Sequence, residues 1–352
     1  MLTAILSAIG VIVAIIITHE LGHFITAKAS GIKVDEFGLG FPPRLFSIRR
    51  GETLYSLNVI PLGGFVKIAG EEDPKVERSL ASKRIGIRLM VLSAGSLMNV
   101  LLPLLLFSIA FIVPHDVVIG QVVVEGTAAN SPAVEAGIKP GDTIISINNK
   151  EINSTLDLSR YIQLNLGKKT TFQVVRSDLS QKEIRLTPRW QPPQGEGAIG
   201  VAVRTLEPTI VSQNEPFWRA IPMGISQTIE TLVLFKNGIL SLLIGVVPIE
   251  VTGPIGIAQI ATEVAKAGIS PLLEFAAFLS INLAILNILP LPALDGGRIA
   301  FVLLEWVRRG KRISPKKEGL VHFVGLFMLM SLILVITYQD IVRIINGNSP
   351  IP

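Results

Sequence analysis

Two histidines and a glutamate stand close together in the run His19-Glu20-Leu21-Gly22-His23. Residues four apart on a helix share a face, so the imidazoles of His19 and His23 can reach one metal ion. Glu20 can then lie beside the open coordination position and accept a proton from water there. The spacing therefore predicts a catalytic metal site with a general base next to it.

The surroundings of this run strengthen the prediction. It lies near the end of a long apolar segment, residues 1–28, which is expected to cross a membrane. Two imidazoles and a carboxylate are costly in hydrocarbon unless they are paired, bound to a metal or functional. A structural polar cluster between helices is the alternative interpretation, and we favour the metal site over it.

A catalytic zinc site has three protein ligands and one open position. The chain has no cysteine, and only His115 and His322 remain as further imidazoles, so a carboxylate is the expected third ligand. The candidate is Asp295, in a stretch where Pro290, Pro292 and two glycines break the helix at membrane depth. Such broken backbone is tolerated only when it is buried in protein or lines a wet cavity. A helix cap or a turn is the alternative role for Asp295.

The elements that must position these residues are mostly apolar. Hydrophobic residues make up 49% of the 352 and charged residues 17%, where a soluble protein has about 25% charged residues. Residues 1 to 17 carry no positive charge, so we interpret the first segment as a retained helix and not as a cleaved signal peptide. The segments expected to span the bilayer are 1–28, 89–113, 271–307 and 320–345.

Clusters of Lys and Arg set the expected orientation. They lie in the segment 29–88 and in the loop 308–319, so the positive-inside rule places both on the cytoplasmic side. This position beside the spans also argues against a nucleic-acid partner, despite the net charge of +5. Within the juxtamembrane region 191–270, the apolar but charged segment 217–247 is expected to be interfacial or re-entrant. One more crossing there would move the loop 308–319 to the outside.

Two regions outside the spans have strand patterns. In the first, residues 45–49 and 53–60 flank Gly51 and predict a β-hairpin, which either offers an edge to an extended peptide or is structural. The second, 114–190, predicts a small α+β domain in which Ser131 caps a short helix that ends at Gly137. Its expected strands are 117–125, 143–147, 170–176 and 183–187, and its expected helices are 131–138 and 156–164.

The predicted fold class is therefore a polytopic α-helical membrane protein with about four transmembrane helices. A membrane-associated β-hairpin is expected on its cytoplasmic side, and one α+β domain is expected to be inserted on the outer side.

The His-Glu-Leu-Gly-His run and the Asn-x-x-Pro-x-Pro-x-Leu-Asp-Gly run resemble those of site-2-type intramembrane zinc metalloproteases. The bacterial branch known as regulator of sigma-E protease is the most similar in spacing and content. Further similarity lies at 37–50, at 61–67, at Gly95-Ser-Leu-Met-Asn99 and at 252–257. The outer segment 131–148 resembles a PDZ domain of the bacterial, circularly permuted kind.

The resemblance implies one catalytic Zn²⁺ bound by His19, His23 and Asp295, with Glu20 as the catalytic acid/base. It also implies that Asn287 binds substrate near the scissile peptide and that the hairpin pairs with an unwound substrate helix. Some members have two tandem PDZ domains, whereas this chain has length for one before residue 217.

The implied substrates are membrane proteins with a single transmembrane helix. The implied activity is regulated intramembrane proteolysis, such as that of anti-sigma factors, or clearance of signal-peptide remnants. The implied location is the inner, cytoplasmic membrane, with the PDZ domain extracytoplasmic.

One alternative is a membrane-anchored PDZ peptide-binding module with a structural metal site, but such a site needs no base like Glu20. The other is a metal transporter, for which a chain of ligands along a pathway is expected instead of one fixed site.

Overall fold

The computed structural model describes residues 2–246 and 252–346, and the chain divides into two compact units. The first unit comprises Met1–Ala110, Phe217–Ile225 and Val251–Pro352. The second comprises Phe111–Pro216 and Ser226–Glu250. All five predicted site residues belong to the first unit.

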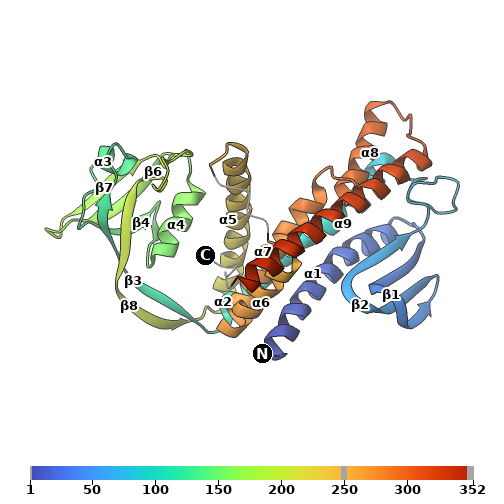
Figure 1. Cartoon of the computed structure of the whole chain (residues 1–352), viewed down its shortest axis with the longest axis horizontal. Coiled ribbons are helices and arrows are strands. Elements are labelled where there is room, and N and C mark those ends of the chain that lie inside the picture. Colours follow the sequence, from blue (N-terminus) through green and yellow to red (C-terminus); the bar gives the residue numbers. More distant parts are fainter. Residues whose placement is uncertain (1, 247–251, 347–352) are drawn as a thin grey trace. The chain divides into compact units, whose positions relative to one another are not determined.

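The first unit is mainly helical (Figure 1). Four of the helices in the described residues are long and apolar enough to cross a membrane, in agreement with the four predicted spans. These are α1 (Leu2–Ala29), α2 (Ile85–Ile112), α7 (Ile269–Ile288) and α9 (Pro315–Ile345). The shorter helices of the unit are α6 (Pro254–Ala267) and α8 (Asp295–Val307).

The third predicted span, 271–307, is not continuous. Helix α7 ends at Ile288, helix α8 begins at Asp295, and the residues between them are not helical. Two prolines in this stretch, Pro290 and Pro292, lack a backbone N–H and cannot continue a helix. Of the two helices, only α7 is long and apolar enough to cross a membrane. The break places Asp295 at the first residue of a new helix.

Helix α6 was not predicted and lies in the region assigned as juxtamembrane, 191–270. Its N-terminus is held by Asp340 of α9, whose carboxylate accepts hydrogen bonds from the backbone N–H groups of Gly253, at 3.3 Å, and Gly256, at 2.8 Å. A carboxylate in this position satisfies N–H groups that the helix itself leaves unpaired. Asp340 is buried.

The predicted β-hairpin is present and is longer than expected. Strands β1 (Val34–Arg50) and β2 (Thr53–Ile68) are antiparallel and join at a turn in which Gly51 has φ 62°. The prolines and glycines in both strands interrupt the alternating pattern, so only the parts nearest the turn were predicted. The strands run on past these residues with several register shifts. As a result, the end of β2 reaches α1 next to the predicted site.

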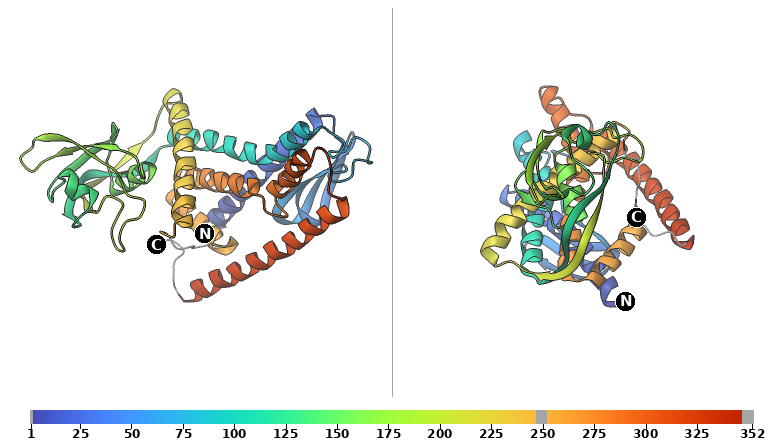
Figure 2. Two further views of the ribbon diagram at one scale, coloured as in Figure 1. Left: turned by 90° about the horizontal axis from the view of Figure 1, so that it is seen from above. Right: turned by 90° about the vertical axis from the view of Figure 1, so that its left-hand side faces the viewer.

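Helix α9 lies along the outside of the helical unit (Figures 1 and 2). Most of its apolar side chains are exposed and almost none is buried, as expected for a helix that faces lipid. Its two buried residues are Gly325 and Asp340.

The second unit contains a six-stranded sheet with the order β7-β6-β4-β3-β8, in which β5 also pairs with β4. Buried apolar side chains such as Phe172, Ile144 and Val122 form its core. Helix α3 (Pro132–Ala136) is capped as predicted: Ser131 accepts from the N–H of Val134, and Gly137 ends the helix with φ 84°. The other elements are β3 (His115–Thr127), β4 (Thr143–Ile147), β5 (Lys150–Glu151), α4 (Thr155–Leu164), β6 (Thr170–Val175), β7 (Gln181–Leu186) and β8 (Val201–Gln213).

The sheet extends beyond the predicted boundary at residue 190. Strand β8 pairs antiparallel with β3 from His115 opposite Gln213 to Thr127 opposite Val201. This strand was missed because Pro208 and several polar residues interrupt its alternation. Proline is tolerated there because β8 is an edge strand.

The segment 217–247 forms helix α5 (Phe217–Leu243), and residue 247 lies outside the described residues. With 27 residues it is longer than α7, but it is not among the four helices whose composition is also apolar enough for a span. Within the second unit its polar face contacts α4: Arg160 lies 2.6 Å from a carboxylate oxygen of Glu230, and Asn237 donates to the carbonyl of Gln163 at 2.6 Å. Its placement at a membrane surface stays a prediction.

Candidate active site

Helix α1 carries His19, Glu20 and His23 on adjoining turns and packs closely against α2. A Cβ atom at Gly22 would lie 2.4 Å from the carbonyl oxygen of Ala94, so only glycine permits this approach. The contact brings the two imidazoles against one face of α2. Both histidines are buried.

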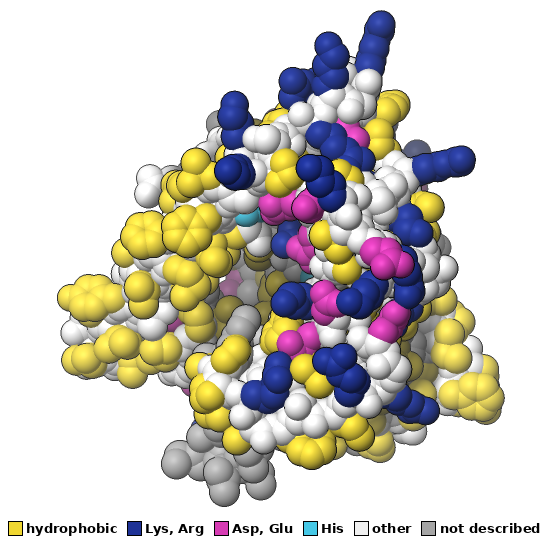
Figure 3. Space-filling model, turned by 90° about the vertical axis from the view of Figure 1, so that its right-hand side faces the viewer, with side chains coloured by type: hydrophobic (Ala, Val, Ile, Leu, Met, Phe, Trp, Pro, Cys, Tyr) yellow, Lys and Arg dark blue, Asp and Glu magenta, His cyan; other side chains and the backbone are white. Residues whose placement is uncertain are grey.

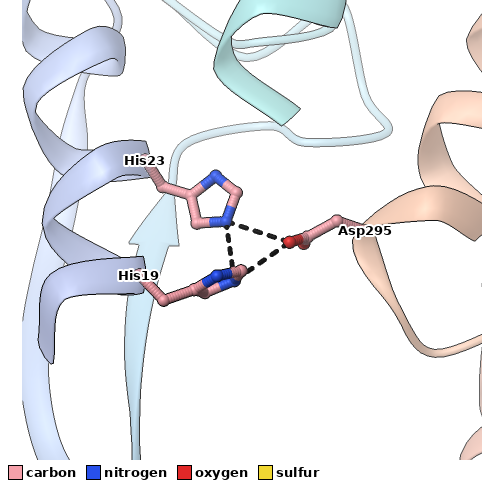
Figure 4. A group of neighbouring side chains, drawn as sticks. All are labelled: His19, His23 and Asp295. Carbon is pink, nitrogen blue, oxygen red and sulfur yellow. Dashed lines mark hydrogen bonds and ion pairs between the residues drawn. The ribbon is translucent and has the colours of Figure 1, made fainter. Parts of the chain in front are cut away.

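The carboxylate of Asp295 completes a group of three converging ligand atoms (Figure 4). Its Oδ2 atom lies 3.0 Å from Nε2 of His19 and 3.1 Å from Nε2 of His23, and the two Nε2 atoms are 3.2 Å apart. A tetrahedral zinc ion with ligands at about 2.0–2.1 Å has its ligand atoms about 3.3 Å from one another. The donor types and their spacing therefore fit a zinc ion with one position open.

The ring of His23 is oriented by the backbone of α2. Its Nδ1 atom lies 2.8 Å from the carbonyl oxygen of Val91. A carbonyl only accepts hydrogen bonds, so Nδ1 must carry the proton, and the lone pair of Nε2 is left available for a metal ion.

Asn99 faces the other imidazole in the same way. Its amide nitrogen lies 3.4 Å from Nδ1 of His19, while its Oδ1 atom is buried without a partner in the described structure. Oxygen and nitrogen of an amide exchange places when the group is turned over. In that orientation Oδ1 accepts from Nδ1–H of His19 and gains its missing partner. The lone pair of His19 Nε2 is then available for a metal ion, as in His23.

Between these two contacts lies Gly95. A Cβ atom there would lie 2.3 Å from Nε2 of His23 and 2.6 Å from Cε1 of His19. Val91, Gly95 and Asn99 are spaced four apart, so they form one face of α2. In the sequence, only the family resemblance pointed to Gly95 and Asn99. The signal that was available for Asn99 was an amide inside an apolar span.

Glu20 lines a cavity of about 830 Å³ together with His19, His23 and Asp295. The last part of β2, from Gly64 to Ile68, forms another wall. A Cβ atom at Gly64 would lie 3.2 Å from Cγ of Glu20, so the strand backbone passes close to the predicted base. Figure 3 shows the hollowed face of the molecule on which acidic and basic side chains gather.

The segment after β2 also lines the cavity and makes a charged contact with α8. Glu71 lies 2.6 Å from Arg298, which is one helical turn after Asp295 on α8. Burial raises the pKa of the Glu71 carboxyl, and the charge of Arg298 opposes this effect. The ion pair connects the segment after β2 to the helix that carries the third candidate ligand.

Asn287, predicted from the resemblance alone, also lies at this site. It is in the last turn of α7, and its amide nitrogen is 3.4 Å from Nε2 of His19. The structure thus brings together His19, His23, Asp295 and Asn287, and Glu20 lines the same cavity. The individual roles of these residues stay predictions.

A family model described as "Peptidase family M50" matches residues 7–332 of this chain. The chain belongs to this family. The M50 assignment confirms the site-2-type intramembrane zinc protease that the two sequence runs resemble, and with it the enzyme class and the zinc cofactor. Together with the four apolar helices, it indicates a multi-pass membrane protein.

The relatives of this M50 protease agree with the assignment. A provisionally named zinc metalloprotease of Clostridium acetobutylicum is 35% identical over 348 residues, 96% of each chain. Zinc metalloprotease RasP of Geobacillus kaustophilus is 32% identical over 427 residues, 97% of this chain and 98% of the relative. Regulator of sigma-W protease RasP of Bacillus subtilis is 30% identical over 413 residues, 93% of this chain and 95% of the relative. The two RasP alignments are longer than this chain of 352 residues, so these relatives contain inserted residues.

Proposed function

We propose that this M50 protease hydrolyses peptide bonds within or beside the transmembrane segment of membrane proteins that have a single such helix. In this proposal His19, His23 and Asp295 hold the zinc ion, Glu20 is the catalytic acid/base and Asn287 binds the substrate. The observation that carries it is the convergence of three ligand atoms, from α1 and α8, at 3.0–3.2 Å from one another.

Zinc bound there supplies Lewis acidity, which activates water and polarises the scissile carbonyl. Glu20 accepts the proton from water and later returns it to the leaving amine. Asn287 holds the extended substrate backbone through its amide. His19 and His23 are buried, and water reaches the site through the cavity that Glu20 lines.

A substrate helix must unwind before it can be cut, because its carbonyl groups are paired inside the helix. The wall of the cavity formed by Gly64–Ile68 of β2 is extended backbone and lies close to Glu20. An unwound substrate segment that pairs with this strand would regain the hydrogen bonds it lost on unwinding. This supports the hairpin as the substrate-holding element.

The proposal places the protein in the inner, cytoplasmic membrane, with the basic segments 29–88 and 308–319 on the cytoplasmic side. The segment 114–190 of the second unit is then extracytoplasmic, and we propose that it is the single PDZ domain. The Bacillus subtilis relative is named as a regulator of sigma-W. We therefore propose regulated intramembrane proteolysis, with anti-sigma factors or signal-peptide remnants as substrates.

The test uses the full chain in liposomes with a single-span reporter whose outer domain has been trimmed. Cleavage is compared between the wild type and Glu20→Gln, which keeps the shape of the side chain but removes the base. Cleavage by the wild type alone supports the proposal. Equal cleavage by both proteins removes Glu20 from its assigned role and points to a contaminating protease.

A further inference from the structure

The residue two positions before Asp295 has an unusual backbone conformation. Ala293 has φ 74°, in the left-handed region that residues other than glycine rarely adopt. Its backbone N–H donates a hydrogen bond to Nδ1 of His322 on α9 at 3.1 Å. A conformation of this kind persists only when the surrounding structure holds it.

Helix α9 supports the same segment at a second point. A Cβ atom at Gly325 would lie 2.2 Å from Cβ of Pro292, so α9 and the segment before Asp295 are in direct contact there. His322 and Gly325 are three residues apart and share one face of α9. Beyond the hydrogen bond, the His322 ring packs against Phe301 of α8, with ring centroids 5.5 Å apart. The imidazole therefore contacts the chain on both sides of Asp295.

The need for a hydrogen-bond acceptor explains why this residue is a histidine. With Nδ1 accepting from Ala293, the neutral ring carries its proton on Nε2, and that atom is buried without a partner in the described structure. An apolar side chain would pack there without an unpaired N–H group, which is costly when buried. His322 is not part of the group of converging ligand atoms found in the described residues.

We propose that His322 is a positioning residue, which holds Ala293 in its left-handed conformation and thereby sets the Asp295 carboxylate for zinc. This inference rests on the proposed function of Asp295 as a zinc ligand. Without the acceptor, the segment 289–294 would relax and Asp295 would point less accurately at the two imidazoles. Partners that orient metal ligands typically change metal affinity about 10–100-fold when removed.

The test measures the dissociation constant for zinc by competition with a chelator, in detergent-solubilised full-length protein. His322→Leu removes the acceptor and keeps an apolar side chain, so its dissociation constant is expected to rise about 10–100-fold. His322→Asn keeps an acceptor at the same number of bonds from Cβ and is expected to stay within about threefold of the wild type. Phe323→Leu, on the neighbouring exposed position, is the control for changes in α9 and is expected to match the wild type.

A second variant tests the backbone part of the inference. Glycine adopts positive φ without strain, so adding Ala293→Gly to His322→Leu is expected to recover part of the lost affinity. Unchanged affinity in His322→Leu, or equal losses in the Leu and Asn variants, overturns the inference. Asp295→Ala separates this result from failure of the proposed site: if that variant keeps its zinc, Asp295 is no ligand and the proposed site is wrong. If it loses zinc while His322→Leu does not, only the inference about His322 is wrong.

Discussion

Nδ1 of His23 lies 2.8 Å from the carbonyl oxygen of Val91, so the backbone of α2 sets the proton position of an imidazole that we propose as a zinc ligand. Asn99, two turns further along that helix, faces Nδ1 of His19. Helix α2 contributes no ligand atom, yet it orients both rings so that each Nε2 atom is directed at Asp295. The candidate zinc site is therefore built by three helices, of which α1 and α8 carry the proposed ligands.

The close approach at Gly95 leads to a first prediction. Gly95→Ala places a methyl group 2.3 Å from Nε2 of His23, where the ring must move away from Asp295. Zinc affinity is expected to fall by at least the amount typical of losing an orienting partner, about 10–100-fold. Zinc content after dialysis against a chelator measures the effect.

Gly86→Ala on the same helix is the matched control. A Cβ atom at Gly86 has no neighbouring atom within 4 Å, and alanine is the better helix former. This variant is expected to keep full zinc content. A Gly95→Ala protein that binds zinc as the Gly86→Ala protein does would show that the rings are less tightly confined than the structure indicates.

Removal of the Asn99 side-chain amide is expected to weaken zinc binding through His19. Asn99→Leu leaves Nδ1–H of His19 buried without an acceptor, so the dissociation constant for zinc should rise about 10–100-fold. Asn99→Asp keeps an acceptor and should bind zinc more tightly than Asn99→Leu. The control is Asn282→Ala, which removes an exposed amide that bonds only to the carbonyl of Phe278. Equal zinc affinity in the Leu and Asp variants would contradict the orienting role.

The buried ion pair between α2 and α8 leads to a prediction about stability: removing the charge of Glu305 should destabilise the protein more than removing that of Arg88. Arg88 lies 2.5 Å from Glu305, and Glu305 also contacts Arg312 at 2.9 Å. Glu305→Gln leaves the buried Arg88 charge unpaired and should lower the free energy of unfolding by about 3–5 kcal/mol. Arg88→Met should cost less, because Glu305 keeps Arg312. Denaturant unfolding in detergent micelles measures the free energy of unfolding of each variant. An equal decrease in the two variants would contradict the prediction that Arg312 compensates Glu305 when Arg88 is lost.

The need for substrate unwinding predicts a dependence on the substrate. Replacing helix-weakening Gly or Pro residues near the scissile bond of the reporter by Leu should slow cleavage, because the segment then leaves its helix less readily. The same substitutions placed about two turns away from the bond serve as the control. Cleavage rates measured in liposomes should fall only for the first set. Unchanged rates would mean that the enzyme does not require local unwinding.

The convergence of the candidate zinc ligands could be predicted from the sequence because their chemistry is local. The spacing of His19 and His23 fixes a shared helix face, and the absence of cysteine with the broken helix around Asp295 indicates the third ligand. Asn287 needed the family resemblance, since an amide near a helix end has many ordinary roles.

Other features could not be predicted because they depend on tertiary contacts. Val91 acts through its backbone carbonyl, which no residue type reveals, and Gly95 matters only through its distance from α1. His322 acts as an acceptor because of the backbone conformation of Ala293, which lies in the segment between α7 and α8. Strand β8 was missed because its pairing with β3, not its own pattern, makes it a strand.

The most direct test of the account is the zinc X-ray absorption spectrum of the purified protein, compared with that of Asp295→Ala. The wild type is expected to show two imidazole nitrogens and a carboxylate oxygen at about 2.0–2.2 Å, and Asp295→Ala is expected to lose most of its zinc. Zinc retained at full stoichiometry in Asp295→Ala, with an unchanged set of ligands, would contradict the site described by His19, His23 and Asp295.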